Sequence, residues 1–179
     1  VARPTDSKPR PAIVVIQEWW GLNDHIKDIA QRFAREGYVA LAPDLYSRLG
    51  HTVTKDGQEA AKLMESLQSQ DALKDLNVTT RYLKTLPFVD DQKLAAVGFC
   101  MGGTFVLMMA AHNSDIKAAV PFYGQVPPTD SLKYLVTPIL YIHGGKDTWI
   151  PKREAERLAQ GLQQYGRPGE VKIYPECDH

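Results

Sequence analysis

The sequence predicts an α/β fold in which a mostly parallel sheet is flanked by helices. Short apolar, β-branched runs recur along the chain, and amphipathic segments of helical length separate them. The first run, Ala12–Gln17, is apolar almost throughout, which is typical of a strand covered on both faces. Strands that alternate with helices form right-handed βαβ units. We therefore expect a single α/β domain over residues 1–179.

The elements of the N-terminal half follow from periodicity and from turn residues. Prolines make Val1–Pro11 an extended entry, and Gly37 ends a helix over Asp24–Glu36 that carries one apolar face. Tyr38–Ala42 is the next expected strand, and Pro43 opens a long loop that reaches Lys55. Two amphipathic helices are then expected, over Gln58–Leu67 and Asp71–Leu86.

The C-terminal half repeats the alternation of strand and helix. The expected strands are Lys93–Gly98, Lys117–Phe122, Pro138–His143 and Glu170–Tyr174. The expected helices are Met101–His112 and Lys152–Tyr165. Ligands of such sheets bind beyond the carboxyl ends of the strands, so the residues that follow each strand are the candidates for chemistry.

Composition excludes several classes of function. The 179 residues include 44% hydrophobic ones, and 21 basic side chains balance 21 acidic ones, so neither nucleic acid nor a membrane surface is an expected partner. No apolar run approaches the roughly 20 residues of a membrane span. Two cysteines and no visible signal peptide favour the cytoplasm, although a leader removed earlier is compatible with Val1 as first residue. We expect a small-molecule ligand and a monomer or weak homodimer.

The strongest local pattern is Gly98-Phe-Cys-Met-Gly-Gly103, which lies between an expected strand and an expected helix. It has the form of a nucleophile elbow, in which glycines allow a sharp turn and the central residue is presented above the sheet. Cys100 would then lie at a helix N-terminus, where a thiolate is favoured. The alternatives are a buried core cysteine and a weak dinucleotide-binding motif, in which Cys100 replaces the second glycine.

A cysteine nucleophile needs a base and a group that orients the base. Asp147 and His179 each follow an expected strand, and the order cysteine, aspartate, histidine is that of the α/β-hydrolases. Asp147 alone could equally stabilise a turn, and a terminal histidine often lies in solvent. His143 is a rival base, although a strand-end histidine bonded to the backbone is the favoured interpretation. The remaining histidines are interpreted as surface or capping residues.

The segment Gln17–Asn23 places polar and aromatic residues at the end of the first expected strand. An oxyanion hole in this fold combines the N–H after the nucleophile with one from an early loop, which indicates Met101 and Trp19. Glu18 is either a catalytic carboxylate or a solvated loop residue. Three further loop residues are candidates for substrate binding or for a purely structural role: Arg48, Tyr123 and Trp149.

These residues together resemble the dienelactone hydrolase family, whose members are also called carboxymethylenebutenolidases, within the α/β-hydrolases. The likeness covers nearly the whole chain and rests on the following segments: Gln17–Asn23, Ala42–Tyr46, Gly98–Gly103, Phe122–Gly124, Gly144–Asp147 and His179. The cysteine elbow and the Gln-Glu-x-x-Gly motif are specific in combination. The resemblance implies an α/β-hydrolase fold and hydrolysis of an ester or lactone.

The resemblance also implies a role for each site residue. Cys100 would be the nucleophile, His179 the general base and acid, and Asp147 its orienter, while Glu18 would control the ionisation of the cysteine. The amides of Trp19 and Met101 would bind the oxyanion. The reaction would pass through a thioester acyl-enzyme, with no metal or organic cofactor.

Three features depart from the family pattern. Family members usually reach the histidine through small residues and glycine, whereas this chain has Glu176-Cys177-Asp178, which could perturb the histidine. Dienelactone-cleaving members use two arginines to hold a substrate carboxylate: the position of one, after the histidine, lies beyond His179, and the region of the other carries Lys55 and Gly57 instead of arginine. An earlier strand pair and a closing helix are also absent, so the chain looks trimmed at both ends.

Two alternatives to hydrolysis remain open from the sequence. One is a catalytically idle hydrolase-like module that binds a partner through an exposed face. The other is a thiol redox protein that uses Cys100 and Cys177.

Overall fold

The computed structural model describes residues 1–179 and divides the chain into two compact units, residues 1–95 and 96–179. Each unit is described separately below. β3 (Val89–Phe99) crosses from the first unit into the second. A single domain over residues 1–179 stays a prediction.

The first unit contains two parallel strands and three helices. β1 (Arg10–Ile16) pairs with β2 (Val39–Leu41), with Ala12 opposite Val39. The helices are α1 (Asp24–Arg35), α2 (Gly57–Ser66) and α3 (Ser69–Thr85), and a short 3-10 helix, η1 (Ser47–Leu49), interrupts the loop after β2. β1 reads Arg-Pro-Ala-Ile-Val-Val-Ile, and its last five residues are buried, as expected for a strand covered on both faces.

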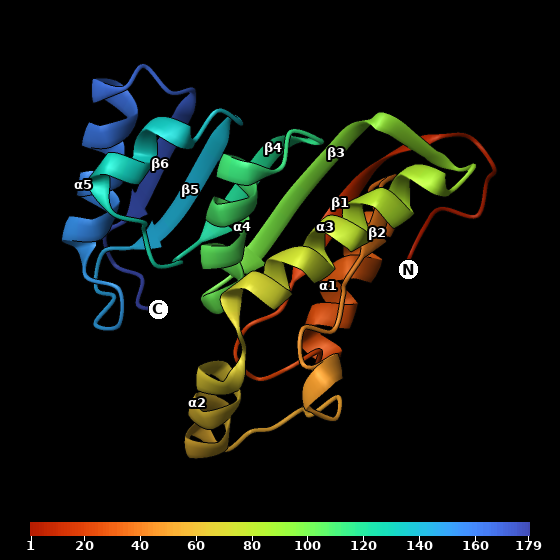
Figure 1. The fold of residues 1–179 in the computed structure, drawn as a ribbon, viewed down its shortest axis with the longest axis horizontal. Helices are drawn as coiled ribbons and strands as arrows, with labels where there is room; N and C mark the ends of the chain where they lie inside the picture. The colour runs from red at the N-terminus through yellow and green to blue at the C-terminus, as the bar shows by residue number, and fades with distance from the viewer. The chain divides into compact units, whose positions relative to one another are not determined.

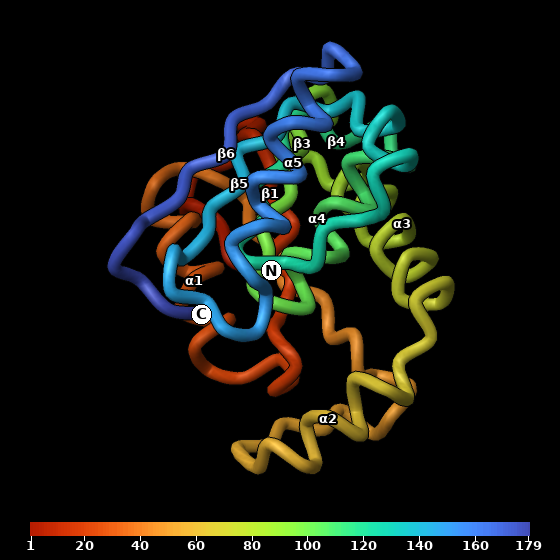
Figure 2. Tube along the Cα trace, turned by 90° about the vertical axis from the view of Figure 1, so that its left-hand side faces the viewer, coloured from red at the N-terminus to blue at the C-terminus, as the bar shows by residue number.

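Capping residues and apolar faces explain the helices of this unit. Asn23 caps α1 by accepting a hydrogen bond from the Ile26 N–H at 3.1 Å, and Gly37, with φ 94°, follows its C-terminus. α1 packs on β1 and β2, and α3 packs on β1. α2 buries only Ala60 and projects from the rest of this unit, as Figures 1 and 2 show.

The second unit continues the alternation of helix and strand. It contains α4 (Met101–His112), β4 (Ile116–Phe122), β5 (Ile139–Gly144), α5 (Lys152–Gln164) and β6 (Gly169–Tyr174), with a 3-10 helix, η2 (Thr129–Tyr134), before β5. β4 and β5 are parallel, as are β5 and β6, whose register places His143 opposite Ile173. α4 packs on β4, and α5 packs on β5 and β6, the three elements at the blue end of the chain in Figure 1.

The strand order is β2-β1-β3-β4-β5-β6. The predicted α/β class is therefore confirmed, and each helix boundary lies within two residues of its expected position. β3 is longer than expected because it begins at Val89, ahead of a polar stretch that interrupts the apolar pattern. The two 3-10 helices, η1 and η2, were not predicted because one turn is too short for a periodic pattern.

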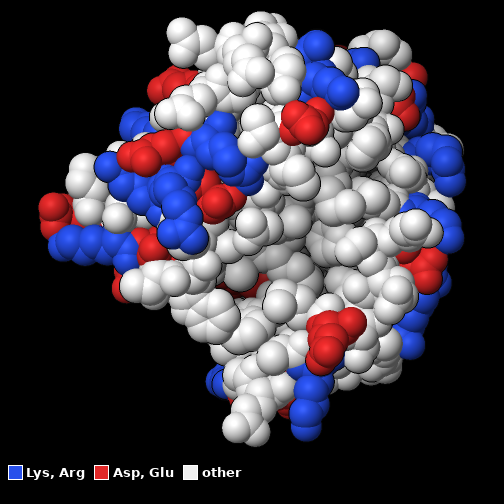
Figure 3. Space-filling model, turned by 60° about the vertical axis from the view of Figure 1, so that its left-hand side comes forward, with Lys and Arg blue, Asp and Glu red and all other residues white.

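None of the helices is both long and apolar enough to cross a membrane. α4 is apolar on all sides, but it has only 12 residues and most of them are buried, so it is a core helix. Acidic and basic side chains are interspersed on the face in Figure 3, with no large patch of one sign.

Candidate active site

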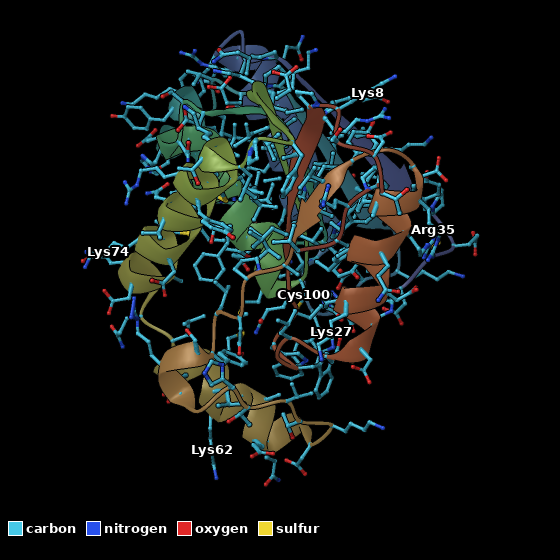
Figure 4. All side chains as sticks on the ribbon, turned by 90° about the vertical axis from the view of Figure 1, so that its right-hand side faces the viewer. Lys8, Lys27, Arg35, Lys62, Lys74 and Cys100 are labelled. Atoms are coloured by element: carbon cyan, nitrogen blue, oxygen red, sulfur yellow. The ribbon has the colours of Figure 1, made fainter.

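Cys100 occupies a strained turn between β3 and α4. Its backbone has φ 52° and ψ −115°, a region that L residues other than glycine rarely adopt. The Cys100 N–H donates a hydrogen bond to the Phe122 carbonyl at 3.1 Å, which fixes the turn to the end of β4. Figure 4 shows Cys100 at one end of α4. This strand–turn–helix geometry is that of a nucleophile elbow.

Glycines make the turn possible. A Cβ on Gly98 would lie 2.6 Å from the Gly102 carbonyl carbon, and a Cβ on Gly103 would lie 3.0 Å from the Gly124 nitrogen. No larger residue fits either position without moving backbone. Met101 begins α4 directly after the half-buried Cys100, so the positive end of the helix dipole favours negative charge at this point.

Asp147 and His179 lie together in the second unit, 32 residues apart in sequence. His179 Nδ1 is 2.8 Å from Asp147 Oδ2, while Asp147 Oδ1 accepts hydrogen bonds from the backbone N–H groups of Trp149 and Ile150, each at 2.8 Å. The Asp147 side chain is fully buried and that of His179 is 20% exposed. Because an ionised carboxylate only accepts, the geometry places a proton on Nδ1 and leaves Nε2 for acid–base chemistry.

Two aromatic side chains contact the His179 ring. The Tyr123 ring centroid is 4.7 Å from that of His179, and the Trp149 centroid is 6.1 Å from it. Tyr123 has φ 38°, and its N–H donates to the Ile142 carbonyl at 2.8 Å, so a second strained backbone at the end of β4 aims this ring. Trp149 is 63% exposed and follows Asp147 by two residues.

His143 is a core residue of β5. It is 1% exposed and stacks on Tyr141 with ring centroids 5.8 Å apart. Its backbone pairs in the strand as expected, whereas neither ring nitrogen forms a hydrogen bond. Burial lowers its pKa, against the opposing influence of the Asp147 carboxylate. A neutral, enclosed imidazole has no access to substrate, so His143 is a poor candidate for the base.

The remaining predicted site residues belong to the first unit. Glu18 and Trp19 follow β1, where the Trp19 carbonyl accepts a hydrogen bond from the Tyr46 hydroxyl at 2.9 Å. The Arg48 guanidinium is paired with Asp75 on α3. Their roles toward substrate or Cys100 stay predictions.

Contacts around the histidine loop, residues 175–179, were not predicted. The Asp178 carboxylate accepts a hydrogen bond from the His179 N–H at 2.8 Å, and the Lys146 N–H donates to the Cys177 carbonyl at 2.9 Å. The signal available in the sequence was the pair Gly144-Gly145 before Lys146, since adjacent glycines often mark a close approach of two backbones.

The fold and the cysteine elbow define an α/β-hydrolase. A crystal structure from Klebsiella pneumoniae subsp. pneumoniae, named "Putative Dienelactone Hydrolase", matches with a TM-score of 0.90 and 33% identity. The match covers 99% of this chain and 79% of that one. The fold predicted from the resemblance is thus confirmed.

The dienelactone hydrolase family matches residues 1–179, and this chain belongs to that family. A Yersinia pestis relative named "Putative carboxymethylenebutenolidase" is 36% identical over 194 residues, which cover 100% of this chain and 72% of the relative. A Methylorubrum extorquens relative of the same name is 33% identical, with 99% of this chain and 65% of the relative covered. The chain thus spans about two thirds to three quarters of the length of these relatives.

Proposed function

We propose that this member of the hydrolase family cleaves an ester or lactone through a cysteine acyl-enzyme, with Cys100 as nucleophile. His179 acts as general base and acid, and Asp147 orients it. The observation that carries the proposal is the 2.8 Å contact between Asp147 and His179, in the same unit as a cysteine on a strained elbow. The names of the relatives point to the same class of substrate.

The proposed first half-reaction forms a thioester. The Cys100 thiol gives its proton to His179 Nε2, and the sulfur attacks the substrate carbonyl carbon. The tetrahedral oxyanion is bound by backbone N–H groups, for which Met101 and Trp19 are the candidates. The oxyanion then collapses, the carbon–oxygen bond to the leaving alcohol breaks, and the imidazolium returns the proton to that oxygen. Glu18 keeps the role that the family resemblance implies, control of the Cys100 proton.

The proposed second half-reaction releases the acid. His179 Nε2 takes a proton from water as the water oxygen attacks the thioester carbonyl. The tetrahedral intermediate then collapses, the carbon–sulfur bond breaks, and the imidazolium returns the proton to the Cys100 sulfur as the carboxylic acid leaves. Asp147 stabilises the imidazolium in both steps because its Oδ2 accepts the Nδ1 proton at 2.8 Å. Tyr123 and Trp149, which contact the imidazole, are positioned to contact substrate as well.

The test uses the two cysteines as a matched pair. Short-chain p-nitrophenyl esters and dienelactone are offered to the native protein and to the variants Cys100→Ala, His179→Ala and Cys177→Ala. We expect the first two to lower kcat by at least about 10³-fold and Cys177→Ala to leave it unchanged. Intact-protein mass spectrometry of the native protein with a slow ester should show one added acyl group, and mass spectrometry after proteolysis should locate it on the Cys100 peptide.

Two outcomes would overturn the proposal. Activity that persists in Cys100→Ala would remove the acyl-enzyme. Equal dependence of activity on Cys100 and Cys177 would favour the thiol redox alternative.

A further inference from the structure

The histidine loop, residues 175–179, packs directly against the double glycine that follows β5. The Gly145 N–H donates to the Tyr174 carbonyl at 2.7 Å, and the Lys146 N–H donates to the Cys177 carbonyl at 2.9 Å. A Cβ on Gly144 would contact the Asp178 carbonyl oxygen and would lie 2.7 Å from that of Cys177. The backbone of the histidine loop is therefore fixed up to Asp178, one residue before the imidazole.

The peptide between Asp178 and His179 is held by a side chain. Asp178 Oδ1 accepts a hydrogen bond from the His179 N–H at 2.8 Å. Rotation of the peptide between these residues would break that bond and swing the imidazole away from Asp147 Oδ2, to which it is joined at 2.8 Å.

We infer that Asp178 is a positioning residue, whose carboxylate oxygen holds the His179 backbone so that the imidazole stays on Asp147. The inference rests on the proposed function for its catalytic consequence. Asp178 is exposed, so solvent screens its charge. We therefore assign its effect on His179 to the hydrogen bond that its oxygen accepts rather than to its charge.

Two substitutions of Asp178 separate its role as a hydrogen-bond acceptor from the effect of its negative charge. Asp178→Asn keeps an oxygen of the same geometry without charge, whereas Asp178→Ala removes the oxygen. We expect Asp178→Asn to retain kcat within about twofold and Asp178→Ala to lower kcat about 10- to 100-fold, with KM changed less than about threefold. The pH profile of kcat/KM should be the same in Asp178→Asn as in the native protein.

Glu176→Gln is the matched control. Glu176 lies two residues earlier in the same loop, is ion-paired with Lys146 at the surface and makes no bond to His179. Its substitution removes the same charge as Asp178→Asn, so activity within about twofold of native is expected. Thermal unfolding of all three variants should occur within about 2 °C of the native Tm. If Asp178→Ala unfolds, Asp178→Leu removes the acceptor while filling the same space.

A spectroscopic measurement tests the position of the ring without any activity. The His179 Nδ1 proton that bonds Asp147 should give a low-field proton NMR signal in the native protein and in Asp178→Asn. In Asp178→Ala the signal should be weakened by exchange with water, since the ring no longer stays on the carboxylate. The Asp147→Asn variant assigns the signal, because loss of the carboxylate acceptor should shift it.

Three results would overturn the inference. In the first, Asp178→Ala keeps native kcat and the low-field signal. In the second, Asp178→Asn is as impaired as Asp178→Ala, which would assign the effect to charge. In the third, Glu176→Gln loses as much activity as Asp178→Ala. Failure of the proposed function gives a different result, namely esterase activity that does not depend on Cys100. In that case the NMR signal still decides whether Asp178 positions the imidazole ring.

Discussion

The loops that follow β5 and β6 hold the carboxylate of Asp147 differently from the way in which the long loop after β2 holds its charged side chains. After β5 and β6, Asp147 is fully buried and receives two backbone N–H groups and His179. After β2, the charged residues form exposed pairs, His51 with Asp44 and Arg48 with Asp75.

The difference comes from the length of the connection and from its glycines. Asp147 lies three residues beyond β5, and Gly144 and Gly145 let the backbone of the next loop approach within van der Waals distance. A short, tightly packed turn fixes the direction of a side chain, whereas a long loop leaves it to find surface partners. Burial also makes hydrogen bonds to the Asp147 carboxylate stronger than those of exposed ion pairs.

The largest expected effect is at the buried carboxylate. Asp147→Asn replaces the acceptor of the His179 Nδ1 proton, so the imidazole can adopt the wrong tautomer, and kcat should fall by about 10⁴-fold. Steady-state kinetics with a p-nitrophenyl ester measure this effect. A decrease of less than tenfold would contradict the comparison, because it would mean that the buried pair matters no more than an exposed one.

The next largest expected effect is a loss of stability, caused by close backbone contact at the elbow. A methyl group on Gly103 would contact the Phe122 carbonyl and approach the Gly124 nitrogen, so Gly103→Ala should lower the free energy of unfolding by about 1–3 kcal/mol. Urea denaturation measures it. The control is Gly57→Ala at the start of α2, where no atom lies within 4 Å of the new methyl, and unchanged or slightly higher stability is expected there. Equal decreases in the free energy of unfolding of the two variants would contradict the assignment of the loss to backbone contact at Gly103.

His143 should make the stability depend on pH. Burial lowers its pKa in the folded protein below the ordinary value near 6.5, so the unfolded chain binds more protons as the pH falls. Its contribution to stability is thus complete above about pH 6.5 and decreases on acidification below that value. In His143→Phe, the free energy of unfolding should vary less with pH between about 4.5 and 7. Parallel curves for the two proteins, from urea titrations at each pH, would contradict this expectation.

The smallest effect is expected at the surface pair. Arg48→Met should lower the free energy of unfolding by less than about 1 kcal/mol, because its partner Asp75 and the guanidinium are both accessible to solvent. If Arg48 also contacts substrate, as the sequence predicts, KM should rise a few fold with little change in kcat. Native KM in Arg48→Met, with Asp75→Asn as the matched control, would remove Arg48 from the binding site.

Much of the fold could be predicted because its signals are local. The apolar run of β1, the Gly37 stop after α1 and the glycines around Cys100 each act within a few residues, and each appears where the sequence places it. The early start of β3 and the 3-10 helices were missed because neither produces an apolar period. Of the site, Asp147 and His179 were predicted as partners from chain order, and the structure joins them.

The contacts of Asp178, Lys146 and Gly144 could not be predicted in the same way. Those of Lys146 and Gly144 join segments more than 30 positions apart in the sequence. The bond from the His179 N–H to the Asp178 carboxylate joins neighbours, but nothing in the sequence Glu176-Cys177-Asp178 indicates that this side chain turns back onto the next peptide. Likewise, the unbonded ring of His143 follows from how β5 is covered rather than from its neighbours in sequence.

The sequence by itself determined the order of strands and helices, the elbow at Cys100 and the candidate acid and base, because these depend on local propensity and on chain order. Only the tertiary structure decided which oxygen faces which nitrogen at His179, how tightly the loops after β5 and β6 pack, and that His143 is enclosed. These features depend on distances between segments remote in sequence, and such distances are set when the strands align in register and the core packs.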